Sequence, residues 1–100
     1  MGYAGVVYTP QAETQLEVLI DSDIRYQLES EEIHWLLLRD AKGLGTLKEF
    51  EGEPVYIFVT KQKLNGPLRL AVTYRILLEP VQLVQIVDIR QFPPATTSVS

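Results

Sequence analysis

The residues best suited to chemistry are two arginines on one predicted strand. From Leu68 to Leu78 the residues alternate, so that Arg69 and Arg75, six positions apart, share a face with Ala71 and Thr73 between them. The opposite face carries large apolar side chains, namely Leu68, Leu70, Val72, Tyr74, Ile76 and Leu78, and is expected to be core. Cations that converge on an open sheet face suit a phosphodiester backbone or a developing oxyanion.

Two lysines can enlarge this basic group. Lys61 and Lys63 share a face of the preceding run, Val55 to Lys63, and lie beside Arg69 and Arg75 if both apolar faces point to the helices. The run is apolar on both faces near its start, so the pattern alone does not determine its register. The alternative is a solvated sheet face whose edge lysines discourage aggregation.

Other candidate residues favour a structural role. His34 is the only histidine and lies in a predicted helix without an evident partner, which is typical of a structural residue. Trp35 continues an apolar stripe with Ile24, Leu28 and Leu38 and is expected in the core. Gly43 to Gly45 follows a helix and does not open one, so it is not a phosphate loop. We expect no metal site and no cofactor.

Composition indicates one small domain with an uneven charge distribution. The 100 residues have a net charge of −4, a pI of about 4.9 and no cysteine, which excludes a disulfide framework. Residues 1–92 are expected to form the domain, and the polar tail 93–100 to be disordered. Carboxylates dominate from Glu13 to Glu53, whereas five of the seven charged residues from Pro54 to Arg90 are basic. With no signal peptide or spanning segment, we expect a cytoplasmic protein.

The elements that must position the basic residues follow from local signals. Gly5 to Tyr8 is a short strand, and Thr9 and Pro10 begin a helix that ends near Ser22. A second helix then runs to Gly43, unless the carboxylates near Ser30 divide it into two.

The remaining chain predicts a sheet. Residues 47–52 are either a loop or a short strand, and three strands follow: 55–63, 68–78 and 81–92. The predicted order β-α-α-β-β-β is α+β, with two N-terminal helices packed on one face of a mainly antiparallel sheet. The first strand must pair with one of the last three.

This order resembles the RelE/ParE superfamily of small toxins, over roughly residues 6–92. Residues 7–16 (VYTPQAETQL) look like its opening strand and helix, and residues 68–78 (LRLAVTYRILL) are similar to its central strand, in which an Arg precedes a Tyr-Arg pair. Residues 47–52 and 64–66 are similar to its Leu-x-Gly segments. Residues 84–92 resemble its last strand, which carries a terminal Arg.

The resemblance implies two related activities. RelE-like members cut messenger RNA on the ribosome with basic residues of the sheet, and ParE-like members inhibit gyrase. By position, Arg69, Arg75 and Arg90 would be catalytic, stabilising attack of a 2′-hydroxyl on the adjacent phosphate. Lys61, Lys63 and Phe92 would bind RNA.

The resemblance also implies partners: an antitoxin protein, and RNA or the ribosome. The chain departs from the family in two respects, because it is acidic and because Gln91-Phe92-Pro93-Pro94 follows Arg90 where a Tyr is expected. Phe92 can stack on a base but cannot donate a proton. The alternative is therefore a non-enzymatic interaction domain on the same scaffold, which binds a protein or forms a homodimer.

Overall fold

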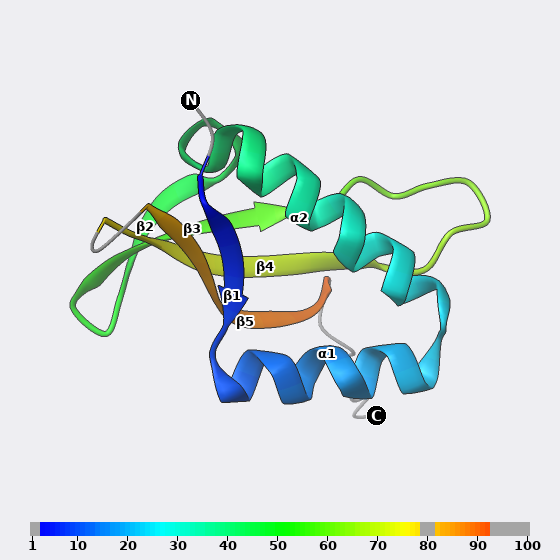
Figure 1. Cartoon of the computed structure of the whole chain (residues 1–100). Helices are drawn as coiled ribbons and strands as arrows, with labels where there is room; N and C mark the ends of the chain where they lie inside the picture. The colour runs from blue at the N-terminus through cyan, green and yellow to red at the C-terminus, as the bar shows by residue number, and fades with distance from the viewer. Residues whose placement is uncertain (1–2, 79–81, 93–100) are drawn as a thin grey trace, which may run out of the picture.

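The computed structural model describes residues 3–78 and 82–92 (Figure 1). The chain forms β1 (Gly5–Tyr8), α1 (Pro10–Ser22), α2 (Arg25–Leu44), β2 (Thr46–Phe50), β3 (Glu53–Val59), β4 (Arg69–Leu77) and β5 (Leu83–Phe92). The predicted α+β fold and element order are confirmed, and the segment that was either loop or strand is the short strand β2. The predicted disordered tail lies outside the described residues.

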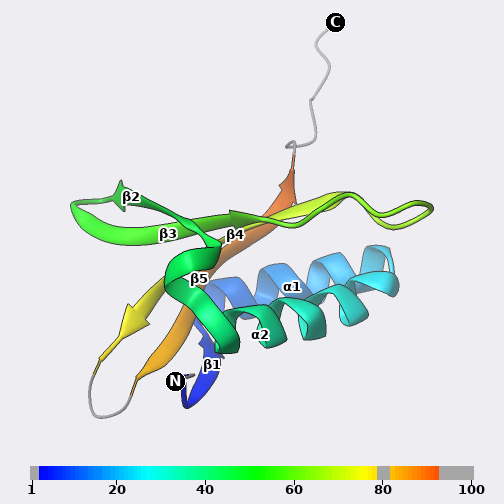
Figure 2. The ribbon, with the colours of Figure 1, turned by 90° about the horizontal axis from the view of Figure 1, so that it is seen from above.

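One mixed sheet contains all five strands, in the order β1-β5-β4-β3-β2. The first strand pairs with the last in parallel, from Gly5 opposite Leu83 to Tyr8 opposite Ile86, and the other pairs are antiparallel. Figure 2 shows both helices on one side of β3 and β4. We call the other side of the sheet the open face. No helix in the described ranges is long and apolar enough to cross a membrane.

Helix α1 begins as its sequence predicts, whereas the N-cap residue of α2 is Ile24, which forms no side-chain capping bond. The Thr9 hydroxyl accepts a hydrogen bond from the Ala12 amide at 3.2 Å, and Pro10 occupies the first position of α1. The Asp23 carboxylate accepts from the Arg25 amide at the start of α2. Helix α2 then runs without a break past Ser30, so the two-helix alternative is wrong there; its one non-helical residue is Asp40.

The core lies between the helices and the middle strands. Leu70, Val72 and Tyr74 of β4 are fully buried, as the alternation predicts, although Leu68 and Leu78 at its ends are exposed. They pack with buried residues of β5 and the helices, namely Ala12, Tyr26, Ile33, Leu37, Ala41, Val84, Ile86 and Ile89.

Trp35 is not part of this core. Its side chain is 69% exposed, and Leu28 and Ile24 are exposed to a similar degree. The face of α2 that is buried instead contains Tyr26, Glu29, Ser30, Ile33, Leu37 and Ala41. The prediction of a core stripe through Trp35 therefore selected the outward face of the helix. It was wrong because the inward face includes polar residues whose partners lie far away in the sequence or in the preceding turn.

An irregularity in β5 determines which side chains reach the open face. The pairing with β4 shifts between Thr73 and Tyr74, which lie opposite Asp88 and Ile86, so Val87 is an extra residue in the ladder. Ile86 and Ile89 are consequently both buried, although they are three residues apart. Asp88 and Arg90 are left on the open face.

Candidate functional site

The open face of the sheet contains a hollow of about 430 Å³, which we call the open-face pocket. Its floor comes from the middle strands and includes Val55, which is only 1% exposed. The other residues that line the pocket lie on β2, on β5 and at the start of α1. The complete set is Gln11, Lys48, Glu49, Phe50, Val55, Ile57, Ala71, Thr73, Asp88, Arg90 and Phe92. An apolar floor with a charged rim can hold a flat ring and an anion together.

Arg69 and Phe92 form one end of this face. The two residues lie directly opposite each other on β4 and β5, and the Arg69 guanidinium carbon is 5.2 Å from the centre of the Phe92 ring. A cation stacked on a ring face is held in a defined orientation. The adjacent pair on the same face is Ala71 and Arg90, so Arg69 and Arg90 are diagonal neighbours across the two strands.

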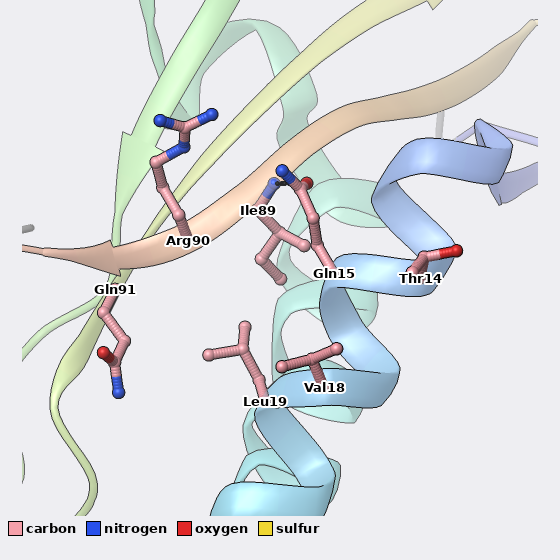
Figure 3. Close-up of a pocket in the computed structure, with 7 residues that line it drawn as sticks. All are labelled: Thr14, Gln15, Val18, Leu19, Ile89, Arg90 and Gln91. Carbon is pink, nitrogen blue, oxygen red and sulfur yellow. Dashed lines mark hydrogen bonds between the residues drawn. The ribbon is translucent and has the colours of Figure 1, made fainter.

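Arg90 is oriented by a neighbour on its own strand. Its Nε and Nη2 atoms each donate to the Asp88 carboxylate at 2.7 Å. Figure 3 shows Arg90 and Gln91 on opposite sides of β5, with Gln15 of α1 beside Ile89. Gln15 donates to Asp88 at 3.0 Å and accepts from the Ile89 amide at 2.9 Å. Helix α1 thus holds the Asp88 carboxylate in place through Gln15, and this carboxylate in turn orients Arg90.

The electrostatics of this pair are strongly coupled. Partial burial raises the pKa of Asp88, but hydrogen bonds from Arg90 and Gln15 outweigh burial and leave the pKa below its usual value. The Asp88 carboxylate in turn raises the pKa of Arg90. Arg90 therefore stays charged, with one edge of its guanidinium occupied and its side chain 61% exposed. An exposed guanidinium held in this way can still bind a phosphate.

Arg75 lies toward the other end of the face. It is six residues from Arg69 along β4, about 20 Å at strand spacing, so the two do not touch one ligand atom. Its guanidinium pairs with Glu53 at 2.6 Å, and its Nε atom is buried without a hydrogen-bond partner among the described residues.

Arg75 lines a second hollow of about 390 Å³, with Thr9, Pro10, Gln11, Phe50, Glu51, Val87 and Asp88. Gln11, Phe50 and Asp88 line both hollows, which therefore adjoin.

The two predicted lysines do not join the arginines. Strand β3 ends at Val59, and the buried hydroxyl of Thr60 accepts from the Leu70 amide at 2.9 Å. Lys61 and Lys63 follow outside the strand and line a hollow between α2 and β3. Lys63 pairs with Glu29 at 2.9 Å and Glu32 at 2.5 Å, both on α2. The expected strand of nine residues was too long, and the cluster of four cations on the open face is not formed.

Lys48 and Phe50 are site residues that the sequence interpretation missed. Both lie on β2, in the segment that was either loop or strand, and both line the open-face pocket. The signal that identifies them is the turn at Glu51 and Gly52, whose φ angles are +52° and +81°. Two central residues with positive φ are typical of a two-residue hairpin turn, which places residues 46, 48 and 50 on one face.

Comparisons with known proteins give no further guide to this site, because no family model, no curated protein and no solved structure matches the chain. The chemistry must be inferred from the side chains. Around the open-face pocket, the charged groups are two cations, Lys48 and Arg90, and two carboxylates, Glu49 and Asp88. His34 is not among the lining residues. Such a set suits binding of an anion beside a ring, and catalysis by charge stabilisation rather than by an imidazole base.

Proposed function

We propose that the chain is a cytoplasmic, RelE/ParE-like toxin-family domain that acts on RNA or the translation apparatus through its open face. The observation that carries this proposal is the group formed by Arg69, Arg90 and Phe92 at one end of the open face, where Arg90 and Phe92 also line the open-face pocket. Guanidinium groups beside an exposed ring are suited to a nucleotide, since they bind its phosphate while the ring stacks on its base.

Each residue has a separate role in this proposal. Phe92 stacks on a base, and Arg69 and Arg90 neutralise the adjacent phosphates. Lys48 contacts the RNA backbone from the opposite rim. Arg75 lies along the path of the RNA and stabilises the charge on the phosphate as the neighbouring 2′-hydroxyl attacks it. This attack forms a 2′,3′-cyclic phosphate and breaks the bond to the 5′-oxygen of the next nucleotide, while solvent accepts the 2′ proton and protonates the leaving oxygen. Lys61 and Lys63 lie off this path and have no role in the reaction. The natural inhibitor of such a domain is an antitoxin protein.

A second function is a protein-interaction domain without catalytic activity. The observation that favours it is the pairing of arginines with carboxylates on the open face: Arg75 with Glu53, and Arg90 with Asp88. These pairs reduce the positive potential that attracts a polyanion. A protein surface with both charge signs would complement such a face better than RNA does.

Binding and cleavage of labelled single-stranded RNA test the first function. Affinity is measured by fluorescence anisotropy over a range of salt concentrations, for the wild type, Arg69→Ala and Arg90→Ala, with Lys42→Ala of α2 as the matched control. If both arginines contact phosphates, each substitution lowers the slope of log K against log salt by about one, and the control does not. An equal loss of RNA affinity in all three variants means that the net charge of the protein, and not the open face, determines binding.

Growth after induced expression in a bacterial host separates the two functions. The wild type is compared with Arg75→Ala at equal soluble abundance, while total RNA is examined for new fragments. Growth arrest with RNA fragments, both relieved by Arg75→Ala, supports the toxin. Normal growth and intact RNA with both proteins, together with no RNA affinity in vitro, favours the interaction domain.

A further inference from the structure

The outward face of α2 carries a regular apolar seam that the fold leaves uncovered. Ile24, Leu28 and Trp35 are 67%, 69% and 69% exposed, and all three are large and apolar. Single exposed apolar residues are ordinary on a protein surface. Here, however, Leu28 and Trp35 lie on one side of α2, opposite the buried residues Ile33 and Leu37, and Ile24 is the N-cap residue of the same helix.

The spacing of this seam is that of a helix that packs against another helix. Residues 24, 28, 31, 35 and 38 follow one another at intervals of four, three, four and three. This alternation keeps side chains in a single stripe and is the pattern of a coiled-coil contact. Glu31 occupies the middle position and half-buried Leu38 the last. The non-helical backbone at Asp40 ends the stripe.

We propose that this seam binds a second copy of the chain, with the two α2 helices antiparallel. The positions of Glu31 and Arg39 favour a second copy as the partner, and they favour the antiparallel direction of the two helices. Glu31 lies between Leu28 and Trp35, and Arg39 lies one turn beyond Trp35 on the same side. In an antiparallel pair Leu28 lies against Leu38 of the second copy. Glu31 then lies beside Trp35 of that copy, within reach of its indole N–H and of Arg39. The two-fold symmetry forms each contact twice.

A parallel pair of the same helices is disfavoured. It places Glu31 against Glu31 at the centre of the seam and Arg39 beside Arg39, and like charges facing each other destabilise a helix pair. The seam spans only about 21 Å, from Ile24 to Leu38, at the helical rise of about 1.5 Å per residue, so each copy contributes one short helix face to the contact. We therefore expect a dimer with a Kd on the order of 10 μM.

This dimer leaves the open face accessible in both copies. Figure 2 shows α2 on one side of β3 and β4, and the open face is the other side of the sheet. The inference does not depend on the proposed function, because its residues do not line that pocket. Either can fail while the other holds.

Trp35, the only tryptophan in the chain, reports on the dimer directly. Sedimentation and tryptophan emission are measured on the whole protein from about 1 to 300 μM, a range that brackets the expected Kd. The wild type is expected to change from monomer to dimer, with the emission maximum moving to shorter wavelength as Trp35 leaves water. Wild type that remains monomeric at the highest concentration, with unshifted emission, overturns the proposal.

Matched substitutions distinguish dimerisation through the seam from non-specific association. Leu28→Glu introduces a charge at an exposed seam position and is expected to abolish the dimer. Leu64→Glu introduces the same charge at a side chain that is 93% exposed in the β3–β4 connection, and should leave the dimer intact. Circular dichroism must show that both variants are folded. Equal dimerisation of the two variants contradicts the proposed surface.

Charge exchange tests the antiparallel direction. Glu31→Arg alone and Arg39→Glu alone each create like charges across the antiparallel seam, and each is expected to weaken self-association about tenfold. A mixture of the two variants restores both attractive pairs and should form a heterodimer with nearly wild-type affinity. If mixing the two variants does not restore dimerisation, the helices are not antiparallel and the proposal fails.

Discussion

The hydroxyl oxygen of Tyr8 lies 2.5 Å from Nε2 of His34, and this contact joins β1 to α2. The two rings are tilted, with centres 5.3 Å apart. Burial raises the pKa of Tyr8 to about 12, so the phenol stays protonated at neutral pH and donates to a neutral imidazole. The one histidine of the chain therefore holds the first strand against the helical layer, on the opposite side of the sheet from the open-face pocket.

The partial burial of His34 predicts a loss of stability in mild acid. Burial lowers the pKa of His34, and the nearby Glu31 carboxylate opposes that shift without cancelling it. The unfolded chain then binds a proton more readily than the folded chain. The free energy of unfolding is expected to be level above the ordinary histidine value of 6.5 and to decrease as pH falls below it.

Urea unfolding at pH values from about 7.5 to 5 measures this effect. His34→Gln keeps a group that can hydrogen-bond to Tyr8 but removes the titration, so its stability should not decrease over this interval. Tyr8→Phe is the matched control and should retain the pH dependence. The lowered pKa of Asp88 acts only below 3.8 and does not overlap. An identical pH slope in His34→Gln and wild type would assign the effect to other groups.

Tyr74→Phe is expected to destabilise the protein by about 1–2 kcal/mol. The Tyr74 hydroxyl is buried and donates to the Ala41 carbonyl at 2.5 Å, beside the non-helical residue Asp40. Phenylalanine leaves that carbonyl without its donor in the core. Tyr56→Phe is the control, because Tyr56 stacks on Tyr74 but its hydroxyl has no hydrogen bond among the residues described. A similar loss in both variants would mean that the bond to the Ala41 carbonyl adds nothing beyond the general effect of removing a hydroxyl group.

Lys63→Ala is expected to cost about 1 kcal/mol, more than a typical surface ion pair. The Glu29 side chain that Lys63 neutralises is only 9% exposed, whereas the Lys63 side chain is 48% exposed. Removing the lysine leaves an almost buried carboxylate unpaired. Lys61→Ala, in the same connection, should change stability by less than about 0.5 kcal/mol. Chemical denaturation of both variants compares the two values, and equal effects would mean that the Glu29 contact adds nothing.

Asp88→Asn is expected to strengthen RNA binding while it weakens the fold. The substitution removes the charge that occupies one edge of the Arg90 guanidinium, so a phosphate meets less competition. Asp21→Asn, exposed at the end of α1, removes the same charge elsewhere and controls for net charge. Anisotropy should show a larger gain for Asp88→Asn than for Asp21→Asn. Equal gains would indicate a long-range charge effect.

Elements that depend on neighbouring residues were predictable from the sequence. The cap at Thr9 and Pro10 determines the start of α1 within one turn. The buried face of β4 follows from alternation, because Leu70, Val72 and Tyr74 lie in the middle of the sheet. Both signals are local, and no distant part of the chain competes with them.

Features that depend on distant residues were not predictable in the same way. Helix α2 has two stripes with apolar residues, and the one that is buried contains Glu29, whose charge is neutralised by Lys63 from another element. The β3 strand ends before Lys61 because the Thr60 side chain bonds to Leu70 across the hairpin. Of the predicted site residues, Arg69, Arg90 and Phe92 lie together because β4 and β5 align them, a register that the pattern alone left open.

The parallel pairing of β1 with β5 has a consequence for how the protein forms during synthesis. The ribosome makes β1 first among the described elements, yet its only strand partner in the sheet, β5, is the last of them to emerge. Helices α1 and α2 have local contacts and can form early, but β1 must wait until residues 83–86 are available. The fold is therefore completed in one late step that joins the two ends of the domain, and a nascent chain that stops short of β5 keeps β1 without its neighbour.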